Sequence, residues 1–187
     1  MEPFSTEPNR LSSASTSPLE GVVSVVVGFG NGRFVEAGIF GRNTVIGGGA
    51  ALGNPLSINQ TISRVGGSGA AAEVHAVRRL AAQSETLRDC FVHHEQMASV
   101  YLQQLAACNA LHSLDKRLIC CLLQTRDLIG SDELPLTHET LSQMLGVRRS
   151  SVTVMARALQ TTGQIRYRHG RIKLLDIEAL LSSCCEC

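Results

Sequence analysis

Near the carboxyl end of the chain, apolar residues recur at helical spacing in two short stretches separated by a glycine. The first stretch follows Thr137, whose hydroxyl can cap a helix, and stops at Gly146, where glycine permits a sharp turn at positive φ. Its apolar stripe consists of Leu141, Met144 and Leu145. The stripe of the second stretch, at 148–160, consists of Val152, Met155, Ala156 and Leu159. The pattern predicts a helix-turn-helix, with a plain αα-hairpin as the alternative.

The residues that follow, at 165–175, alternate between apolar and basic side chains. The apolar positions are Ile165, Tyr167, Ile172 and Leu174. His169 and Gly170 lie at the centre of the stretch and supply a turn. This is the pattern of a short basic β-hairpin, which beside a helix-turn-helix would form the wing of a winged helix.

Positive charge is concentrated in this region. The interval 137–175 contains seven basic residues and one acid, Glu139, whereas the whole chain has 17 basic and 16 acidic residues and a net charge of +1. A cationic cluster on such a motif is typical of phosphate contact, so we expect double-stranded DNA as the partner. The residues of the second helix that could reach base edges or phosphates are Arg149, Ser150, Thr153 and Arg157.

A long helix is predicted upstream, at 84–109, where the chain contains neither Gly nor Pro. Residues at alternating spacings of four and three form a heptad pattern along it: Leu87, Phe91, His94, Ala98, Tyr101, Leu105 and Cys108. This pattern predicts the seam of a homodimer. The alternative is an amphipathic helix that packs on its own domain.

The amino-terminal part of the chain has a different composition. Residues 1–18 are rich in Ser, Thr, Pro and Asn, which predicts disorder. Strands are predicted at 22–29, 33–40 and 59–65, and a helix at 70–83. The glycine-rich stretch 46–53 is expected to serve turns and close packing. The fold class is therefore α+β: a β domain at 19–83, the long helix at 84–109 and a helix-turn-helix domain at 113–187.

The region from His112 onward resembles the carboxyl-terminal half of the Crp/Fnr family of bacterial transcription regulators. The resemblance rests on Leu134-Pro135-Leu136-Thr137, Leu145-Gly146-Val147, Arg149-Ser150-Ser151-Val152-Thr153 and Gly163-Gln164-Ile165. It implies dimerisation through the long helix and an eight-stranded jelly-roll sensor. Because residues 19–83 are too few for that sensor, we expect an incomplete jelly roll, either trimmed or beginning upstream. The stretch 46–53 lacks the acid and the arginine of the family's cyclic-nucleotide site.

The resemblance also assigns expected roles to individual residues. Base-reading positions are Arg149, Ser150, Thr153 and Val154. Phosphate-contacting positions are Thr137, His138, Arg148, Ser151, Arg157, Arg168, His169 and Arg171. Well-studied members carry Glu and Arg where this chain has Ser150 and Val154, so their DNA half-site cannot be transferred. RNA polymerase is a further candidate partner.

Seven cysteines offer an alternative chemistry. Cys90, Cys108, Cys120 and Cys121 fall on predicted helices, and Cys184, Cys185 and Cys187 lie in the tail. A soft metal or a redox disulfide could use the tail cluster, and Cys90 with His93 and His94 could bind zinc. No ligand spacing matches a standard zinc site, so we expect no metal and no cofactor. The odd cysteine count without a secretory segment indicates the cytoplasm.

Other functions are disfavoured. No arrangement typical of catalytic triads, paired carboxylates or zinc hydrolases is present, which argues against an enzyme. No apolar segment is long enough to span a membrane. Three hypotheses follow: a dimeric, sequence-specific transcription regulator; a dimerising protein that cannot switch and titrates related regulators; or a cysteine-based redox or metal-responsive regulator.

Overall fold

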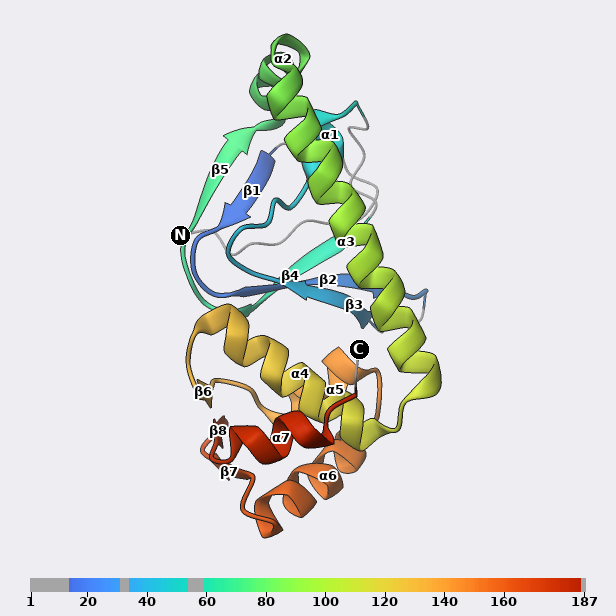
Figure 1. Cartoon of the computed structure of the whole chain (residues 1–187), viewed down its shortest axis with the longest axis vertical. Coiled ribbons are helices and arrows are strands. Elements are labelled where there is room, and N and C mark those ends of the chain that lie inside the picture. Colours follow the sequence, from blue (N-terminus) through green and yellow to red (C-terminus); the bar gives the residue numbers. More distant parts are fainter. Residues whose placement is uncertain (1–13, 31–33, 54–58, 186–187) are drawn as a thin grey trace. The chain divides into compact units, whose positions relative to one another are not determined.

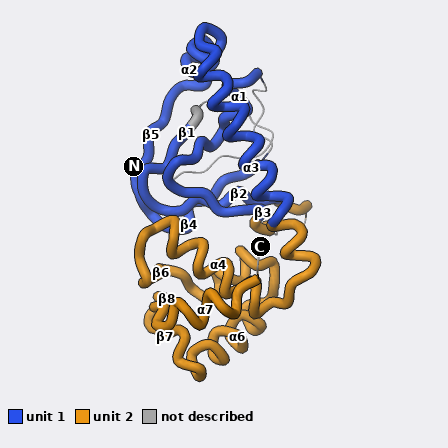
Figure 2. Tube along the Cα trace, viewed as in Figure 1, with its two compact units in different colours: residues 1–27, 37–104 blue, residues 28–36, 105–187 orange. Residues whose placement is uncertain are grey.

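The computed structural model describes residues 14–30, 34–53 and 59–185. The chain forms two compact units, one made of residues 1–27 and 37–104 and the other of residues 28–36 and 105–187 (Figure 2). Among the described residues, the first unit holds the strands of the amino-terminal part and the second holds the carboxyl-terminal helices. The predicted α+β class is confirmed.

The first unit is built on two small sheets (Figure 1). Strands β2 (Val22–Gly28), β3 (Phe34–Phe40) and β4 (Gln60–Val65) form one sheet in the order β3-β2-β4, and β2 pairs with β4 in antiparallel fashion. The run from Val22 to Val26 is buried and supplies most of this core. These strands were predicted from their β-branched composition. Residues 31–33, between β2 and β3, lie outside the described residues.

Two elements of this unit differ from the sequence prediction. Residues Ala14–Pro18, which were assigned to the disordered segment, form strand β1. Its antiparallel partner is β5 (Gly69–Glu73), which was expected to begin a helix. The helix α2 therefore starts only at Val74 and ends at Gln83. The two strands satisfy each other's backbone groups, and this pairing outweighs both the polar composition of β1 and the helix propensity of the alanines in β5.

The five strands of the described amino-terminal part are fewer than the eight of a jelly roll. A short helix α1 (Gly48–Ala51) lies within the glycine-rich stretch. A Cβ at Gly48 would lie 2.7 Å from Oε1 of Glu95 and 3.4 Å from the ring of Phe91, so glycine permits close packing here. The structure thus supports the reading of these glycines as packing and turn residues.

The long helix α3 extends from Glu85 to Leu111, close to its predicted range, and passes from the first unit into the second. Helix α4 (Leu114–Ile129) follows after the N-cap Ser113 and ends at Gly130, which has a φ of +67°. Leu118 and Leu122 of α4 are fully buried. They form the centre of a core to which every later element of the second unit contributes.

The second unit is a helical domain with a small sheet. Helices α5 (His138–Leu145), α6 (Arg149–Thr161) and α7 (Ile177–Ser183) surround the core. Strands β7 (Ile165–Arg168) and β8 (Arg171–Leu174) form the predicted hairpin, and β6 (Glu133–Leu134) adds a third strand in the order β6-β8-β7. The fully buried side chains that join these elements are Leu134, Leu136, Leu141, Val152, Ile165, Ile172 and Leu180.

Candidate DNA interface

The turn between α5 and α6 has the geometry predicted for a helix-turn-helix. Thr137 caps α5, because its hydroxyl oxygen accepts a hydrogen bond from the backbone N–H of Thr140 at 3.0 Å. Gly146 ends the helix at a φ of +67°, a conformation that side chains with a Cβ rarely adopt. Arg148 then serves as the N-cap of α6, so the second helix begins one residue later than predicted.

Helix α6 has one buried face and one exposed face. Val152, Ala156 and Leu159 are buried, as their spacing predicted. The opposite face carries Arg149, Ser150, Val154 and Arg157, all exposed; the exposed fraction of Val154 is 60%. The exposed face of α6 thus carries two arginines, a serine and one apolar side chain.

His138 connects three elements of the second unit. It is the first residue of α5, and its Nδ1 shares a hydrogen bond of 3.1 Å with the hydroxyl of Thr153 on α6. Its imidazole also stacks on the ring of Tyr167 in β7, with centroids 4.1 Å apart and an interplanar angle of 25°. This one side chain therefore contacts α5, α6 and β7.

This position bears on two of the expected roles. His138 was expected to contact phosphate, but its Nε2 is buried and has no hydrogen-bond partner among the described residues. Burial and the nearby positive charge of Arg149 lower its pKa below the usual 6.5. The Thr153 hydroxyl is likewise occupied, since it also donates to the carbonyl of Arg149 at 3.0 Å. Both side chains are therefore engaged within the second unit, and their expected DNA contacts stay predictions.

The wing turn lies beside the amino end of α5. A Cβ at Gly170 would lie 3.5 Å from Cγ2 of Thr137. His169 and Gly170 both have positive φ, of +49° and +76°, which is the geometry of a tight two-residue hairpin turn. The side-chain oxygen of Gln160 on α6 accepts a hydrogen bond of 2.8 Å from the backbone N–H of Tyr167. The β7–β8 hairpin is therefore bonded to α6, and its turn lies beside the amino end of α5.

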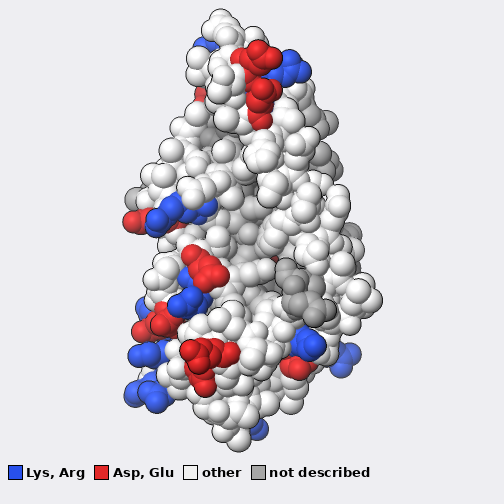
Figure 3. Space-filling view, in the orientation of Figure 1, with Lys and Arg blue, Asp and Glu red and all other residues white. Residues whose placement is uncertain are grey.

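Basic residues gather on the wing. Arg166, Arg168, Arg171 and Lys173 are all exposed, and blue side chains cluster at the lower left of Figure 3, over the strands labelled β7 and β8 in Figure 1. Glu133 lies among them, because β6 pairs with β8 and places it opposite Lys173. Its Oε1 is 3.5 Å from Nη1 of Arg171. The cationic surface is thus partly neutralised by an acid that lies outside the interval counted from the sequence.

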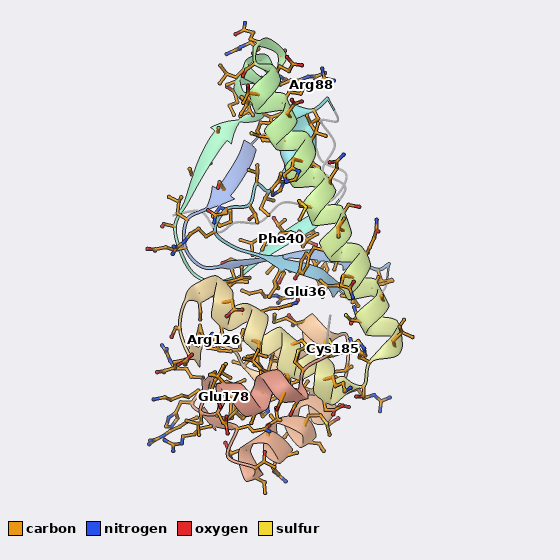
Figure 4. The ribbon with its side chains drawn as sticks, in the orientation of Figure 1. Glu36, Phe40, Arg88, Arg126, Glu178 and Cys185 are labelled. Atoms are coloured by element: carbon orange, nitrogen blue, oxygen red, sulfur yellow. A yellow bond between two sulfur atoms is a disulfide. The ribbon has the colours of Figure 1, made fainter. Side chains whose placement is uncertain are left out.

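Another arginine connects α4 to the helix-turn-helix. Nη2 of Arg117 donates a hydrogen bond of 2.7 Å to the carbonyl oxygen of Leu145. This carbonyl belongs to the last turn of α5, where backbone acceptors lack partners within the helix. Arg126, in the same helix, is instead paired with acids: its Nε is 2.6 Å from Asp132, and its Nη1 is 3.1 Å from Asp127. Figure 4 labels Arg126 among the side chains of the second unit.

The heptad residues of α3 face their own unit in the first part of the helix. Nε2 of His94 accepts a hydrogen bond of 3.0 Å from the N–H of Val45, and the Tyr101 hydroxyl accepts one of 3.4 Å from the N–H of Ile39. The ring of Tyr101 also meets Phe40, labelled in Figure 4, edge to face at 5.6 Å. All seven residues of the predicted seam are half-buried: Leu87, Phe91, His94, Ala98, Tyr101, Leu105 and Cys108. His94 and Tyr101 therefore contact their own unit, and the role of the stripe as a dimer seam stays a prediction.

A second row of residues on α3 is exposed throughout its length. It is displaced by one position toward the amino end, which is about 100° around the helix. The row consists of Thr86, Cys90, His93, Met97, Val100, Gln104, Ala107 and Leu111. Met97, Val100 and Leu111 are exposed by 56%, 59% and 80%, which is high for large apolar side chains. This row has the same spacing as the predicted seam, but the predicted seam has more large apolar residues, so the sequence pattern pointed to the seam and not to this row.

Five metal-binding or redox-active side chains meet in the second unit. Cys120 of α4 and Cys184 after α7 form a disulfide. The Sγ of Cys185, labelled in Figure 4, lies 3.3 Å from that of Cys120. The ligand atoms of Cys108, His112 and Cys185 all lie within 4.8 Å of one another. Sequence spacing could not reveal this cluster, because its members come from three separate elements; Cys187 lies outside the described residues.

The other cysteines stand apart from this cluster. Cys90 is exposed on α3 and Cys121 is buried. Nδ1 of His94 lies 3.8 Å from Oε1 of Glu95, and its Nε2 is bonded to the backbone, which leaves the group suggested for Cys90, His93 and His94 without a convergent geometry. In the part of the chain that the structure describes, no helix combines the length and apolar character needed to cross a bilayer.

Comparison with known proteins agrees with this architecture. Residues 116–183 match the family described as the Crp-like helix-turn-helix domain. No curated protein matches the sequence. FixK2 from Bradyrhizobium japonicum is similar in structure, with a TM-score of 0.82 at 14% identity, covering 100% of this chain and 98% of its own.

Two further structures share the fold. A CRP-family transcriptional regulator from Thermus thermophilus has a TM-score of 0.77 at 17% identity and covers 96% of this chain and 95% of its own. A crp/fnr-family regulator from Eubacterium rectale has a TM-score of 0.74 at 18% identity and covers 91% of this chain and 80% of its own. The chain therefore carries a Crp-like helix-turn-helix domain at residues 116–183 and has the fold of the Crp/Fnr transcription regulators.

Proposed function

We propose that this protein is a transcription regulator that binds a specific sequence of double-stranded DNA as a homodimer. Helix α6 enters the major groove, and the β7–β8 wing lies along the phosphates. The observation that carries this proposal is the position of His138, which bonds to Thr153 and stacks on Tyr167. Its two contacts keep the exposed face of α6 and the cationic wing on one continuous surface.

The base-reading residues are Arg149, Ser150 and Val154. They are exposed at the amino end of α6, the part of a recognition helix that contacts base edges. Arg149 can pair with O6 and N7 of a guanine, and Val154 can meet a thymine methyl. Thr153 belongs to the same face, but its hydroxyl is bonded to His138, so it acts as a positioning residue.

The phosphate contacts come from the edge of α6 and from the wing. Arg148, Arg157, Arg168 and His169 are exposed and supply charge or hydrogen-bond donors. Thr137 and Ser151 supply hydroxyls near the ends of α5 and α6. Arg171 contributes less in the free protein, because Glu133 lies 3.5 Å from it. These contacts orient the protein on DNA without selecting a sequence.

The dimer forms through the exposed row on α3 with a second copy of the same chain. The row keeps the alternating spacing of a parallel two-stranded coiled coil along the whole helix. Met97, Val100 and Leu111 supply its apolar contacts, and Gln104 can pair with its symmetry mate and fix the register. A two-fold axis along this seam places two recognition helices on one DNA face and implies a palindromic site.

The decisive experiment is selection of bound duplexes from a random pool, followed by fluorescence anisotropy at several salt concentrations. We expect a palindromic sequence and an affinity that falls with salt, with a slope of about −0.9 per phosphate contacted. Arg79→Ala, on the exposed surface of α2, is the control for loss of one positive charge. A slope near zero would exclude DNA binding and favour the hypothesis of a protein that titrates related regulators.

This function places the protein in the cytoplasm, with RNA polymerase as a further partner of the DNA-bound dimer. A regulator of this kind binds DNA without changing it chemically. We therefore expect the duplex to be recovered unaltered after prolonged incubation with the protein.

A further inference from the structure

We propose that Cys108, His112, Cys120 and Cys185 form a binding site for a thiophilic divalent metal ion, of which Zn²⁺ is the expected occupant. The site lies entirely within the second unit and is separate from the surface proposed to contact DNA. Its four ligands come from the end of α3, from α4 and from the residues after α7. The inference does not depend on the proposed function.

Cys108 and His112 form one side of the site. Cys108 lies in the last turn of α3, and His112 directly follows Leu111, the last residue of that helix. The N–H of His112 donates to the carbonyl of Cys108 at 3.0 Å, so the helical turn continues to the histidine. Their ligand atoms and the Sγ of Cys185 all lie within 4.8 Å of one another.

Cys120 supplies the fourth ligand from α4. Its Sγ lies 3.3 Å from the Sγ of Cys185. Cys120 groups with Cys184 and Cys185, whereas Cys108 and His112 group with Cys185 alone, so Cys185 is the ligand that the two groups share. Once the disulfide is reduced, the Cys120 side chain has to turn from Cys184 toward Cys108 and His112 to complete a tetrahedron with Zn–S bonds of about 2.3 Å. Three cysteines and one histidine are an established ligand set for structural zinc. Bound Zn²⁺ would stabilise the thiolate forms of the three cysteines.

The disulfide between Cys120 and Cys184 makes metal binding dependent on the redox state. A dithiol donates two electrons and two protons to this disulfide, becomes a disulfide itself, and leaves both cysteines as thiols. Zn²⁺ then binds Cys108, Cys120 and Cys185 as thiolates, with release of three protons, and binds His112 as neutral imidazole. Cys184 is not a ligand; it is the oxidation partner of Cys120.

Such a site would fasten the end of α3 and the residues after α7 to α4. In the oxidised form the disulfide connects only the residues after α7 to α4. The metal would add the connection between α3 and α4, because Cys108 lies on α3 and His112 directly follows it. The reduced, metal-bound protein therefore has the end of the long helix attached to the helix-turn-helix domain.

The test uses the full-length protein, reduced with a phosphine and then freed of reductant under anaerobic conditions. Titration with Co²⁺ should give the ligand-field bands of tetrahedral cobalt and thiolate charge-transfer bands at one equivalent, and Zn²⁺ should displace it. Serine at position 108, 120 or 185, or His112→Ala, should weaken binding by more than the roughly 10–100-fold typical of an outer-shell partner. Cys184→Ser, Cys121→Ser and Cys90→Ser should bind as the wild type does.

Two further measurements keep the outcome interpretable. Far-UV circular dichroism verifies that each variant is folded, and X-ray absorption on the zinc-loaded wild type should report three sulfurs and one nitrogen. Absence of a tetrahedral cobalt signal from the folded, reduced wild type would overturn the proposal. So would a Cys184→Ser variant that loses binding as completely as Cys120→Ser, because Cys184 would then be a ligand.

Discussion

The imidazole of His138 stacks on the phenol ring of Tyr167, with 4.1 Å between the ring centroids. Because the same imidazole is bonded to Thr153, the wing cannot tilt away from the recognition helix without disrupting one of the two contacts. The relative placement of the groove-reading helix and the wing is therefore set by a small number of side chains, and each can be altered separately.

Acid should destabilise the protein through His138. Its pKa in the folded state is lower than the ordinary 6.5, because of burial and of Arg149, so the unfolded chain takes up a proton more readily. This part of the free energy of unfolding is fully present above pH 6.5 and is lost as the pH falls through the lower folded value. His138→Asn should flatten the dependence in urea unfolding between about pH 7.5 and 5. His75 is an exposed histidine on α2, and His75→Asn should leave the pH dependence of the wild type unchanged. Equal slopes of the free energy of unfolding against pH in the wild type and both variants would contradict the assignment to His138.

Thr153→Val should destabilise the second unit. The substitution preserves shape but leaves Nδ1 of His138 without its partner, which costs about 1–3 kcal/mol for a buried polar group. The matched control is Thr161→Val, because that hydroxyl also donates to the carbonyl four residues earlier and lies at the far end of α6 from His138. Urea unfolding of both variants measures the difference. If the two lose equal stability, the bond to His138 contributes nothing.

Arg149→Ala and Arg168→Ala should affect DNA binding differently. Loss of Arg149 should cost roughly 1–3 kcal/mol on the selected sequence and relax preference at one base pair. Loss of Arg168 should weaken binding to all sequences alike and reduce the salt slope by about one phosphate contact. Anisotropy with the selected duplex and with single-base variants distinguishes them. An identical residual preference in both variants would refute the division between base and phosphate contacts.

Glu133→Gln should strengthen DNA binding. The change removes the acid that lies 3.5 Å from Arg171 and releases this arginine for a phosphate. The slope of log affinity against log salt should steepen by about 0.9, the value for one additional contact. Glu178→Gln, an exposed acid on α7, removes the same charge away from the wing. If both glutamate variants behave alike, net charge alone accounts for the effect.

Val100→Glu should dissociate the dimer. Val100 lies in the exposed row of α3, so a carboxylate there would face the same carboxylate of the second copy. Like charges in a coiled-coil core oppose association. Ala106→Glu introduces the same charge on an exposed part of α3 outside the row and should remain dimeric. Sedimentation equilibrium reports the mass of each variant. In the wild type, mild oxidation should also cross-link Cys90 to Cys90 of the second copy, and Cys90→Ser should abolish the cross-link.

The helix-turn-helix and the wing were predictable because local signals specify them. Gly146 and the His169–Gly170 turn require backbone conformations that few residues adopt, and apolar spacing defines the buried faces of α5 and α6. The role of His138 was not predictable, because stacking on Tyr167 depends on the closeness of residues far apart in sequence. The same reason hid the convergence of Cys120 and Cys185.

The amino-terminal part and α3 both show what a sequence pattern leaves open. The alanines of β5 favour a helix locally, yet they pair with β1, whose polar residues carry no strand pattern. On α3 the stripe with the larger side chains packs on its own unit, as Tyr101 and His94 show, and the weaker stripe stays exposed. Periodicity identifies an amphipathic face but does not identify what that face contacts.

The bond from Arg117 to the carbonyl of Leu145 has a mechanical consequence. A hydrogen bond from a charged donor contributes about 1.5–3 kcal/mol, so a rotation of α4 either carries the end of α5 with it or forfeits that energy. Because α4 directly follows the long helix, torque arriving from α3 would reach the turn at Gly146, and so the orientation of α6, through this guanidinium as well as through the buried core around Leu118 and Leu122.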